Sequence, residues 1–237
     1  MHILSPRRVL AGPSTPAQPA RRAICTAALV ALAGAFSLTT QAQDTFKPPP
    51  PVTYTERYEI YGGINLMNGQ AGQNIPKRFN AGGGEIMATY WLTPKWGVAG
   101  SGRYEAGTTP VLPGAQATTP PVQTRPLVTE FIGMGGAQYH WFGNRYAGVN
   151  LHALAGVASG TFDHSNPGLP INTFTAATGL YSNRTAFNGV AGGSIDFNRS
   201  AAVAIRLSPE IVFEKFGTET REFFSISGGV IYRFGQR

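Results

Sequence analysis

Apolar and polar residues alternate with a period of two through eight stretches of the sequence that follow Tyr54. Successive side chains of a β-strand point to opposite sides, so this alternation is typical of strands with one apolar face. The pattern predicts strands at residues 57–67, 83–92, 96–105, 128–141, 146–159, 184–197, 202–214 and 223–234. Each is long enough to cross a bilayer at a tilt, which takes about 9–11 residues.

One face of each stretch carries no charged residue. In residues 202–214, Arg206, Glu210 and Glu214 all fall in one register. A face without charge suits contact with lipid, since an Arg or Lys at mid-bilayer costs about 2–4 kcal/mol. We therefore expect all charged residues of the strands to face inward, and the others are Glu59, Glu85, Arg103, Glu105, Glu130, Asp196 and Arg233. Pro209 falls within a stretch and has no N–H, so we expect a bulge or a skipped ladder bond there.

Short and long connections alternate along the chain. Tight turns are predicted at residues 93–95, 142–145 and 198–200, and longer loops at 68–82, 106–127, 160–183 and 215–222. Aromatic residues gather near the tight turns, as in a girdle at a membrane interface: Tyr90, Trp96, Tyr139, Trp141, Tyr146, Phe197, Tyr232 and Phe234. The prediction is an all-β fold, a closed antiparallel up-and-down transmembrane β-barrel of eight strands, with short periplasmic turns and longer surface loops. A soluble lipocalin-like barrel or sandwich shows the same alternation with its apolar face inward.

The N-terminal segment favours the membrane alternative. Arg21-Arg22 precede an apolar run at residues 23–38, and Thr40-Gln41-Ala42 supply small residues two apart. This arrangement predicts a secretory signal peptide over residues 1–42. Residues 43–53 contain four consecutive prolines and are expected to form an extended spacer before the barrel at 54–237.

Composition removes several classes of function. The single cysteine, Cys25, lies in the predicted leader, so thiol chemistry and disulfides are not expected in the mature chain. Four of the 19 basic residues also lie there, and without them the net charge falls from +7 to +3, with 15 basic and 12 acidic side chains. The charge is therefore weak evidence for nucleic-acid binding, which we do not expect.

The end of the chain carries the most specific motif. Ser227-Gly228-Gly229-Val230-Ile231-Tyr232-Arg233-Phe234 resembles the C-terminal assembly signal of bacterial outer-membrane barrels, with Ser227, Gly229, Tyr232 and Phe234 at its defining positions. It departs from that signal in the three residues that follow Phe234. Together with the strand pattern, residues 54–237 resemble the small barrels typified by the OmpA transmembrane domain, OmpX and the opacity proteins. The resemblance implies an outer-membrane location among lipid and lipopolysaccharide, and insertion by the barrel-assembly machinery.

The width of such a barrel restricts what it can do. An eight-stranded barrel is barely wide enough for its own side chains. We therefore expect the inward Arg103, Arg206 and Arg233 to pair with the carboxylates Glu85, Glu130 and Glu210, which favours a locked lumen over a narrow passive pore. His140 and His152 lack a metal-ligand spacing, and neither a metal site nor a cofactor is expected.

One motif raises an enzymatic alternative. Phe162-Asp163-His164-Ser165-Asn166 faintly resembles the active-site motif of the outer-membrane lipid A 3-O-deacylase. That family separates its His and Ser by one residue, so that a strand places both on one face, whereas His164 and Ser165 are adjacent. We therefore interpret the motif as a surface loop and the protein as not an enzyme. A structural role in the envelope and adhesion through a ligand of loops 106–127 and 160–183 stay equally open.

Overall fold

The computed structural model describes residues 52–73, 75, 77–112, 125–164, 175 and 178–236. Its strands are β1 (Glu56–Gly69), β2 (Phe79–Trp91), β3 (Trp96–Thr108), β4 (Leu127–Gly143), β5 (Ala147–Thr161), β6 (Arg184–Asn198), β7 (Val203–Glu214) and β8 (Arg221–Gln236). The eight predicted strands are confirmed, and the ends differ by at most four residues, at the start of β2. Thr175 and Thr178 belong to a helical turn. The predicted leader and most of the spacer lie outside the described residues.

No helix in the described part of the chain has the length and apolar character required of a membrane span.

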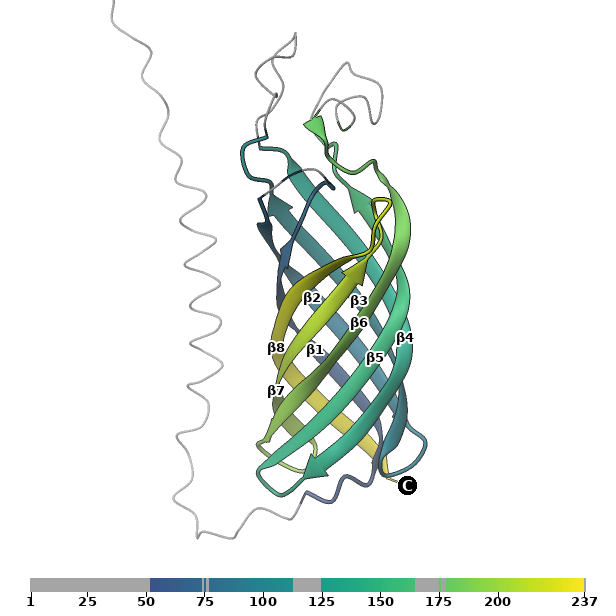
Figure 1. Ribbon diagram of the computed structural model, residues 1–237. Helices are drawn as coiled ribbons and strands as arrows, with labels where there is room; N and C mark the ends of the chain where they lie inside the picture. The colour runs from purple at the N-terminus through teal and green to yellow at the C-terminus, as the bar shows by residue number, and fades with distance from the viewer. Residues whose placement is uncertain are drawn as a thin grey trace, which may run out of the picture. The chain divides into compact units, whose positions relative to one another are not determined.

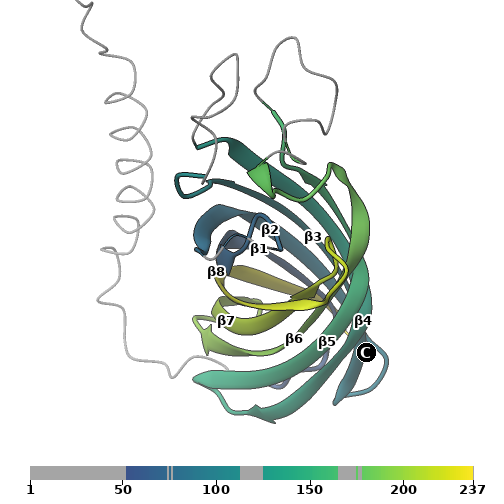
Figure 2. The same ribbon diagram turned by 45° about the horizontal axis from the view of Figure 1, so that its top comes forward.

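Every strand pairs antiparallel with the next strand along the chain, and β8 returns to pair with β1. The result is a closed barrel of eight strands, as predicted (Figures 1 and 2). The three tight turns and the end of β8 lie at one end of this barrel (Figure 1), and the long connections lie at the other. We call the end with the tight turns the inner end and the end with the long connections the outer end.

Glycines make the contact between the first and last strands possible. Gly63 of β1 lies opposite Gly229 of β8 in the ladder. A Cβ atom on Gly229 would lie 2.2 Å from the carbonyl oxygen of Gly62 and 2.5 Å from the Cα of Gly63. These obstacles are backbone atoms that cannot rotate away, so a side chain at position 229 would push the two strands apart. The glycine of the C-terminal motif thus lies where the barrel closes.

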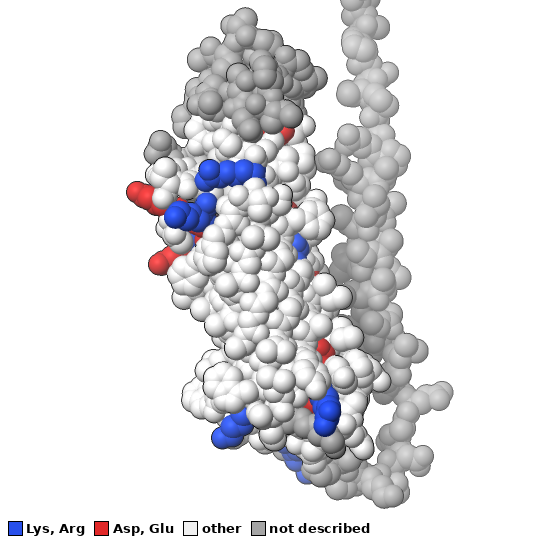
Figure 3. Space-filling view, turned by 90° about the vertical axis from the view of Figure 1, so that its right-hand side faces the viewer, with Lys and Arg blue, Asp and Glu red and all other residues white. Residues whose placement is uncertain are grey.

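The exterior of the barrel is apolar between its two ends. The outward rows of the strands leave large hydrophobic side chains exposed, for example Ile64 at 71% and Ile86 at 61%. On the face seen in Figure 3, Lys, Arg, Asp and Glu appear toward the two ends, and the surface between them is almost free of charge. A soluble barrel would hide its apolar face inside, so this arrangement excludes the lipocalin-like alternative and defines a surface for lipid.

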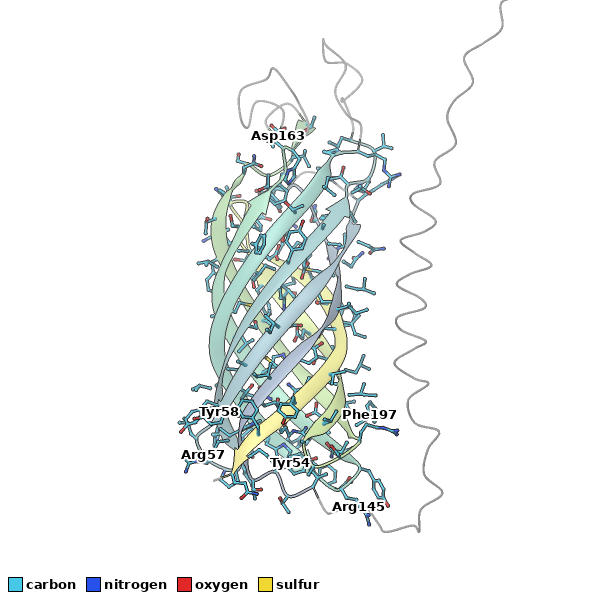
Figure 4. The ribbon with its side chains drawn as sticks, turned by 180° about the vertical axis from the view of Figure 1, so that it is seen from behind. Tyr54, Arg57, Tyr58, Arg145, Asp163 and Phe197 are labelled. Carbon is cyan, nitrogen blue, oxygen red and sulfur yellow. The ribbon has the colours of Figure 1, made fainter. Side chains whose placement is uncertain are left out.

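Aromatic side chains surround the barrel near the inner end, as predicted. Tyr58 lies between Tyr90 and Phe234, with both ring centroids at 5.3 Å, and Trp96 contacts Tyr139 at 4.7 Å. Figure 4 shows Tyr58 and Phe197 at this level of the barrel. Amphipathic rings favour the boundary between hydrocarbon and water, so this girdle marks the inner membrane interface of the barrel.

The ladder between β6 and β7 is interrupted beside Pro209. Gly192 pairs with Glu210 and Ile195 with Leu207, while the two intervening pairs are missing and the register is unchanged. Pro209 has no N–H to donate to a neighbouring strand. The skipped ladder bond that the sequence predicts is therefore confirmed.

We expect the outward aromatic row of β8 to be required for assembly. Tyr232 and Phe234 are exposed at the inner girdle, beside the ladder to β1. In a Tyr232→Asp, Phe234→Asp double variant, two carboxylates would enter the membrane at the closing seam, and the chain should fail to fold. The matched control is Gln236→Asp, which adds a carboxylate beyond this row. The measurement is outer-membrane recovery together with heat-modifiable gel migration, and normal folding of the double variant would contradict the assignment.

Candidate functional site

The charged side chains of the strands fill the lumen. Ten of the described charged residues are at most 6% exposed there: Glu59, Glu85, Arg103, Glu105, Glu130, Asp196, Arg206, Glu210, Glu214 and Arg233. A buried charge is tolerated only when it is paired and hydrogen-bonded, so the partners of these groups decide what the lumen can do. From the inner to the outer end they form three groups.

The inner network consists of Glu59, Asp196, Arg206 and Arg233. Arg206 Nη2 lies 2.7 Å from Glu59 Oε1, and its Nε lies 2.7 Å from Asp196 Oδ1. Arg233 bonds to the same two carboxylates, at 2.8 Å to Asp196 Oδ2 and 3.2 Å to Glu59 Oε2. These residues come from β1, β6, β7 and β8, so the network joins both sides of the closing seam and is balanced in charge.

The middle network consists of Glu85, Arg103, His152 and Glu210. Arg103 Nη2 donates to Glu85 Oε1 at 2.9 Å and also to Glu210 Oε2. His152 Nε2 lies 2.8 Å from the second oxygen of Glu210. Strands β2, β3, β5 and β7 supply these residues, so the middle network crosses the lumen.

The outer carboxyl cluster consists of Glu105, Glu130 and Glu214. Asn65 Nδ2 donates to Glu105 at 2.6 Å, and Asn188 Nδ2 donates to Glu214 at 3.0 Å. The carboxyl group of Glu130 lies next to that of Glu214. Among the described residues, neither an Arg nor a Lys forms an ion pair with these three carboxyl groups.

The sequence therefore predicts the charged face but not all of its partners. Glu85, Arg103 and Glu210 come together in one network, whereas Arg206 and Arg233 pair with Glu59 and Asp196, which lay outside the predicted pairs. Glu130 has no Arg partner, because the register places it opposite Glu105, while Arg103 lies opposite Glu85. Alternation fixes which face a residue occupies, but its depth depends on the strand register.

Loop residues pack against one another at the outer end of the barrel. The rings of Phe162, Tyr181 and Phe216 contact one another, with centroid distances of 5.1–6.0 Å, and all three are at most 7% exposed. Ala71 and Ile75 are buried in the same hydrophobic cluster. We call these five residues the outer cap. They come from three different connections and lie outside the strand pattern, so strand alternation carries no signal for them.

Hydrogen bonds tie the bases of these connections together. The backbone N–H of Tyr181 donates to the carbonyl of Ala71 at 2.8 Å. Gln73 Nε2 donates to Thr218 Oγ1 at 2.8 Å, and the N–H of Phe162 donates to Asn183 Oδ1 at 2.6 Å. The outer cap is thus held by backbone and side-chain bonds between connections that are far apart in the sequence.

Tyr54 covers the inner end. Its hydroxyl donates to the carbonyl of Asn144 at 3.2 Å and accepts from Asn198 Nδ2 at 2.8 Å. Its ring lies 4.4 Å from the ring of His140, and the Arg233 guanidinium lies 5.2 Å from its centroid. Figure 4 shows Tyr54 at the tight-turn end of the barrel. The segment before β1 therefore links two tight turns to the inner network.

The backbone around Tyr54 is adapted to this position. Tyr54 is the only described non-glycine residue with a positive φ, at 52°. A Cβ atom on Gly143 would lie 2.5 Å from the Tyr54 ring, and one on Gly148 would lie 2.7 Å from its hydroxyl. These two glycines, at the end of β4 and the start of β5, make room for the ring, beside a register shift between His140 and Phe142. A strained residue held by this many contacts indicates a position fixed by its surroundings.

The remaining candidate residues form ordinary hydrogen bonds. His164 is exposed, and its Nε2 lies 2.7 Å from Thr129 Oγ1, while Ser165 lies outside the described residues. His140 Nδ1 lies 2.7 Å from Asn150 Oδ1. Among the described residues, no group of three or more His, Cys, Asp or Glu side chains is arranged to hold a metal ion.

The fold and its surface define a class of protein. A closed barrel of eight antiparallel strands, apolar outside and charged inside, is the architecture of the small outer-membrane β-barrels. Comparison with protein-family models finds no match, and comparison with curated proteins finds none.

The chain is similar to solved structures of this class. Neisserial surface protein A matches with a TM-score of 0.52 at 9% identity, over 75% of this chain and 97% of its own. Ail of Yersinia pestis, in complex with the heparin analogue sucrose octasulfate, matches at 0.43 and 17% identity, over 76% and 99%. The N-terminal barrel of Pseudomonas aeruginosa OprF matches at 0.40 and 15%, over 76% and 98%. The closed barrel and its apolar exterior are those of a membrane-spanning β-barrel.

Loss of the inner-network arginine should destabilise the barrel. Arg206 is 0% exposed and bonds to two carboxylates, so Arg206→Ala leaves Glu59 and Asp196 with one cation between them. We expect a loss of about 3–5 kcal/mol in the free energy of unfolding. Equilibrium denaturation in detergent measures it, with the exposed Arg199→Ala as control. An unchanged midpoint for the Arg206 variant would show that the network contributes no stability.

Proposed function

We propose that the protein is a non-enzymatic outer-membrane barrel that presents its outer loops to an external partner and carries nothing through its lumen. The observation that carries this proposal is the outer cap. Phe162, Tyr181 and Phe216 place the bases of the outer connections on a packed hydrophobic layer over the lumen. Such a layer would obstruct a pore. In a binding surface, it orders the bases of the loops before contact, which lowers the entropy cost of binding.

The charge of the outer rim indicates the chemistry of the partner. The described basic residues at the outer end are Lys77, Arg78, Arg125, Arg184, Lys215 and Arg221, and the described acidic residues there are Asp163, Glu219 and Glu222. Arg184 and Lys215 are both exposed, at the adjoining ends of β6 and β7. This excess of positive charge favours a partner that carries phosphate or sulfate groups, either an external polyanion or the phosphorylated glycolipid of the membrane itself.

A structural role in the envelope is the second candidate. The apolar belt is bordered by basic residues at the outer rim and also at the inner rim, where Lys95 and Arg199 are exposed. Such borders attract anionic lipid head groups, and a barrel held in this way would stiffen the membrane around it. A narrow pore is less well supported because all three groups of charges lie in the lumen. Hydrolysis of lipid A is less well supported because His164 and Ser165 are adjacent.

Replacing the outer loop tips separates the two roles. We expect that a variant with short Gly/Ser linkers in place of residues 113–124 and 165–174 still folds, because the outer cap and all strands are retained. Cells carrying it should lose their retention on immobilised dextran sulfate, while the outer membrane keeps its resistance to detergent. Unchanged retention with a detergent-sensitive membrane would instead support the structural role.

Paired charge variants test the chemistry of the partner. Arg184→Gln with Lys215→Gln removes two exposed charges at the outer rim, and Lys95→Gln with Arg199→Gln removes two at the inner rim. Only the outer pair should weaken retention on dextran sulfate in intact cells, and added salt should abolish the difference between the pairs. Equal effects of the two pairs would show that the net charge, and not the outer rim, governs binding.

A further inference from the structure

Among the described residues, the outer carboxyl cluster is the charged group of the lumen that forms no ion pair with an Arg or Lys. Glu105 of β3 lies directly opposite Glu130 of β4 in the ladder, and Glu130 lies next to Glu214 of β7. None of the three is more than 4% exposed. Three ionised carboxylates at this depth would repel one another without an ion pair to compensate them.

The cations nearest to the cluster form their ion pairs with other carboxylates. Arg103 of β3 is paired through Nη2 with Glu85 and Glu210 in the middle network, and its buried Nε and Nη1 have no hydrogen-bond partner. It lies near Glu105 without an ion pair to it. Arg221 of β8 lies opposite Glu214 in the ladder, but its guanidinium forms an ion pair with Glu219 at 3.0 Å and donates to the carbonyl of Gln73.

The other groups that face the cluster are neutral. Asn65 of β1 donates to Glu105, and Asn188 of β6 donates to Glu214. Asn65 Nδ2 also lies 3.4 Å from the hydroxyl oxygen of Ser225 of β8. The phenol of Tyr181, from the outer cap, lies near Glu130 and Glu214 and next to Arg221. None of these groups supplies the positive charge that the three carboxylates would require.

The hydrogen-bonding atoms of the cluster point to a missing donor. Four buried oxygens lack a hydrogen-bond partner: Asn65 Oδ1, Glu105 Oε2, Glu130 Oε2 and Asn188 Oδ1. All four are acceptors. Moreover, ionised carboxylates only accept, so the neighbouring carboxyl groups of Glu130 and Glu214 can bond to each other only when one of them carries a hydrogen. The unpartnered acceptors and the two neighbouring carboxyl groups both point to a hydrogen ion in the cluster.

We propose that the outer lumen is a proton-binding site, in which Glu105, Glu130 and Glu214 together hold at least one proton at neutral pH when the barrel is folded. The proton comes from water and returns to it, and no other bond is made or broken. It neutralises a carboxyl group, supplies the donor between Glu130 and Glu214, and so permits β3, β4 and β7 to carry acidic residues at one depth.

The site makes the stability of the barrel fall as pH rises. A glutamate of the unfolded chain loses its proton near a pH of about 4.3. At higher pH the folded barrel then holds more protons than the unfolded chain does. Each excess proton lowers the folding equilibrium constant about tenfold per pH unit. Paired carboxylates give the opposite dependence, which is confined to acid, so the two effects fall in different pH ranges.

Equilibrium unfolding of the purified protein, measured between about pH 6 and pH 9, tests the site. Glu130→Gln supplies the donor without a titrating group, so it should reduce the dependence by up to about one tenfold step per pH unit and stabilise the barrel at the alkaline end. Glu222→Gln, at an exposed position on β8, is the matched control and should leave the dependence unchanged. All other titratable residues are retained in both variants, so their contributions cancel in the comparison.

Two further measurements keep the result decisive. Glu85→Gln removes a carboxylate that is paired with Arg103, so it should destabilise the barrel at every pH of the series, opposite to Glu130→Gln. Glu214→Gln takes the place of Glu130→Gln if the latter fails to fold. An unchanged pH dependence in these cluster variants would overturn the proposal. So would a dependence that millimolar Ca²⁺ abolishes and a chelator restores, because a metal ion would then be the bound cation.

Discussion

The ladder between β1 and β8 is the contact on which the rest of the structure depends. A sheet in lipid has no water to satisfy the N–H and C=O groups of its edges, so it must close on itself. Here closure runs along most of both strands, from the pair of Glu56 and Gln236 to the pair of Asn68 and Phe224. The glycines at 63 and 229 let the two backbones approach each other where side chains would separate them. Once the ring is closed, each side chain faces either lipid or lumen.

The lumen must then accommodate every charge that the outer surface excludes. Seven carboxylates and three arginines of the described residues share this space. The three arginines form ion pairs in the inner and middle networks. The carboxylates without an ion pair lie near the outer end. Apolar inward side chains such as Met87, Met134 and Leu154 fill space between the charged groups. The lumen is therefore lined by the barrel's own charged and apolar side chains.

The amino-acid pattern predicts the fold well because each strand reports locally on which face meets lipid. The eight strands, the tight turns, the aromatic girdle and the interruption at Pro209 follow from residues close together in the sequence. The partners of Arg206 do not follow in this way. Glu59 lies on β1 and Arg206 on β7, so the depth of one relative to the other depends on the register of the strand pairs that join them. The role of Ser227, Gly229, Tyr232 and Phe234 as an assembly signal stays a prediction.

Two features had no signal in the alternation. Tyr54 precedes the first strand, and its position depends on glycines in a distant turn. Phe162, Tyr181 and Phe216 lie in connections, where period-two patterning ends. A signal for the outer cap did exist in composition, since large aromatic residues in polar loops favour burial once a cavity below them is available. Together, Tyr54 and the outer cap cover the two ends of the filled lumen.

The central claim is that the lumen is closed to ions by its own side chains. The most direct test is the conductance of the purified protein in a planar lipid bilayer at neutral pH. The structure predicts insertion without a large steady conductance, because the middle network crosses the lumen and aromatic residues lie at both ends of it. A large, steady ohmic current from the folded, heat-modifiable protein would contradict it.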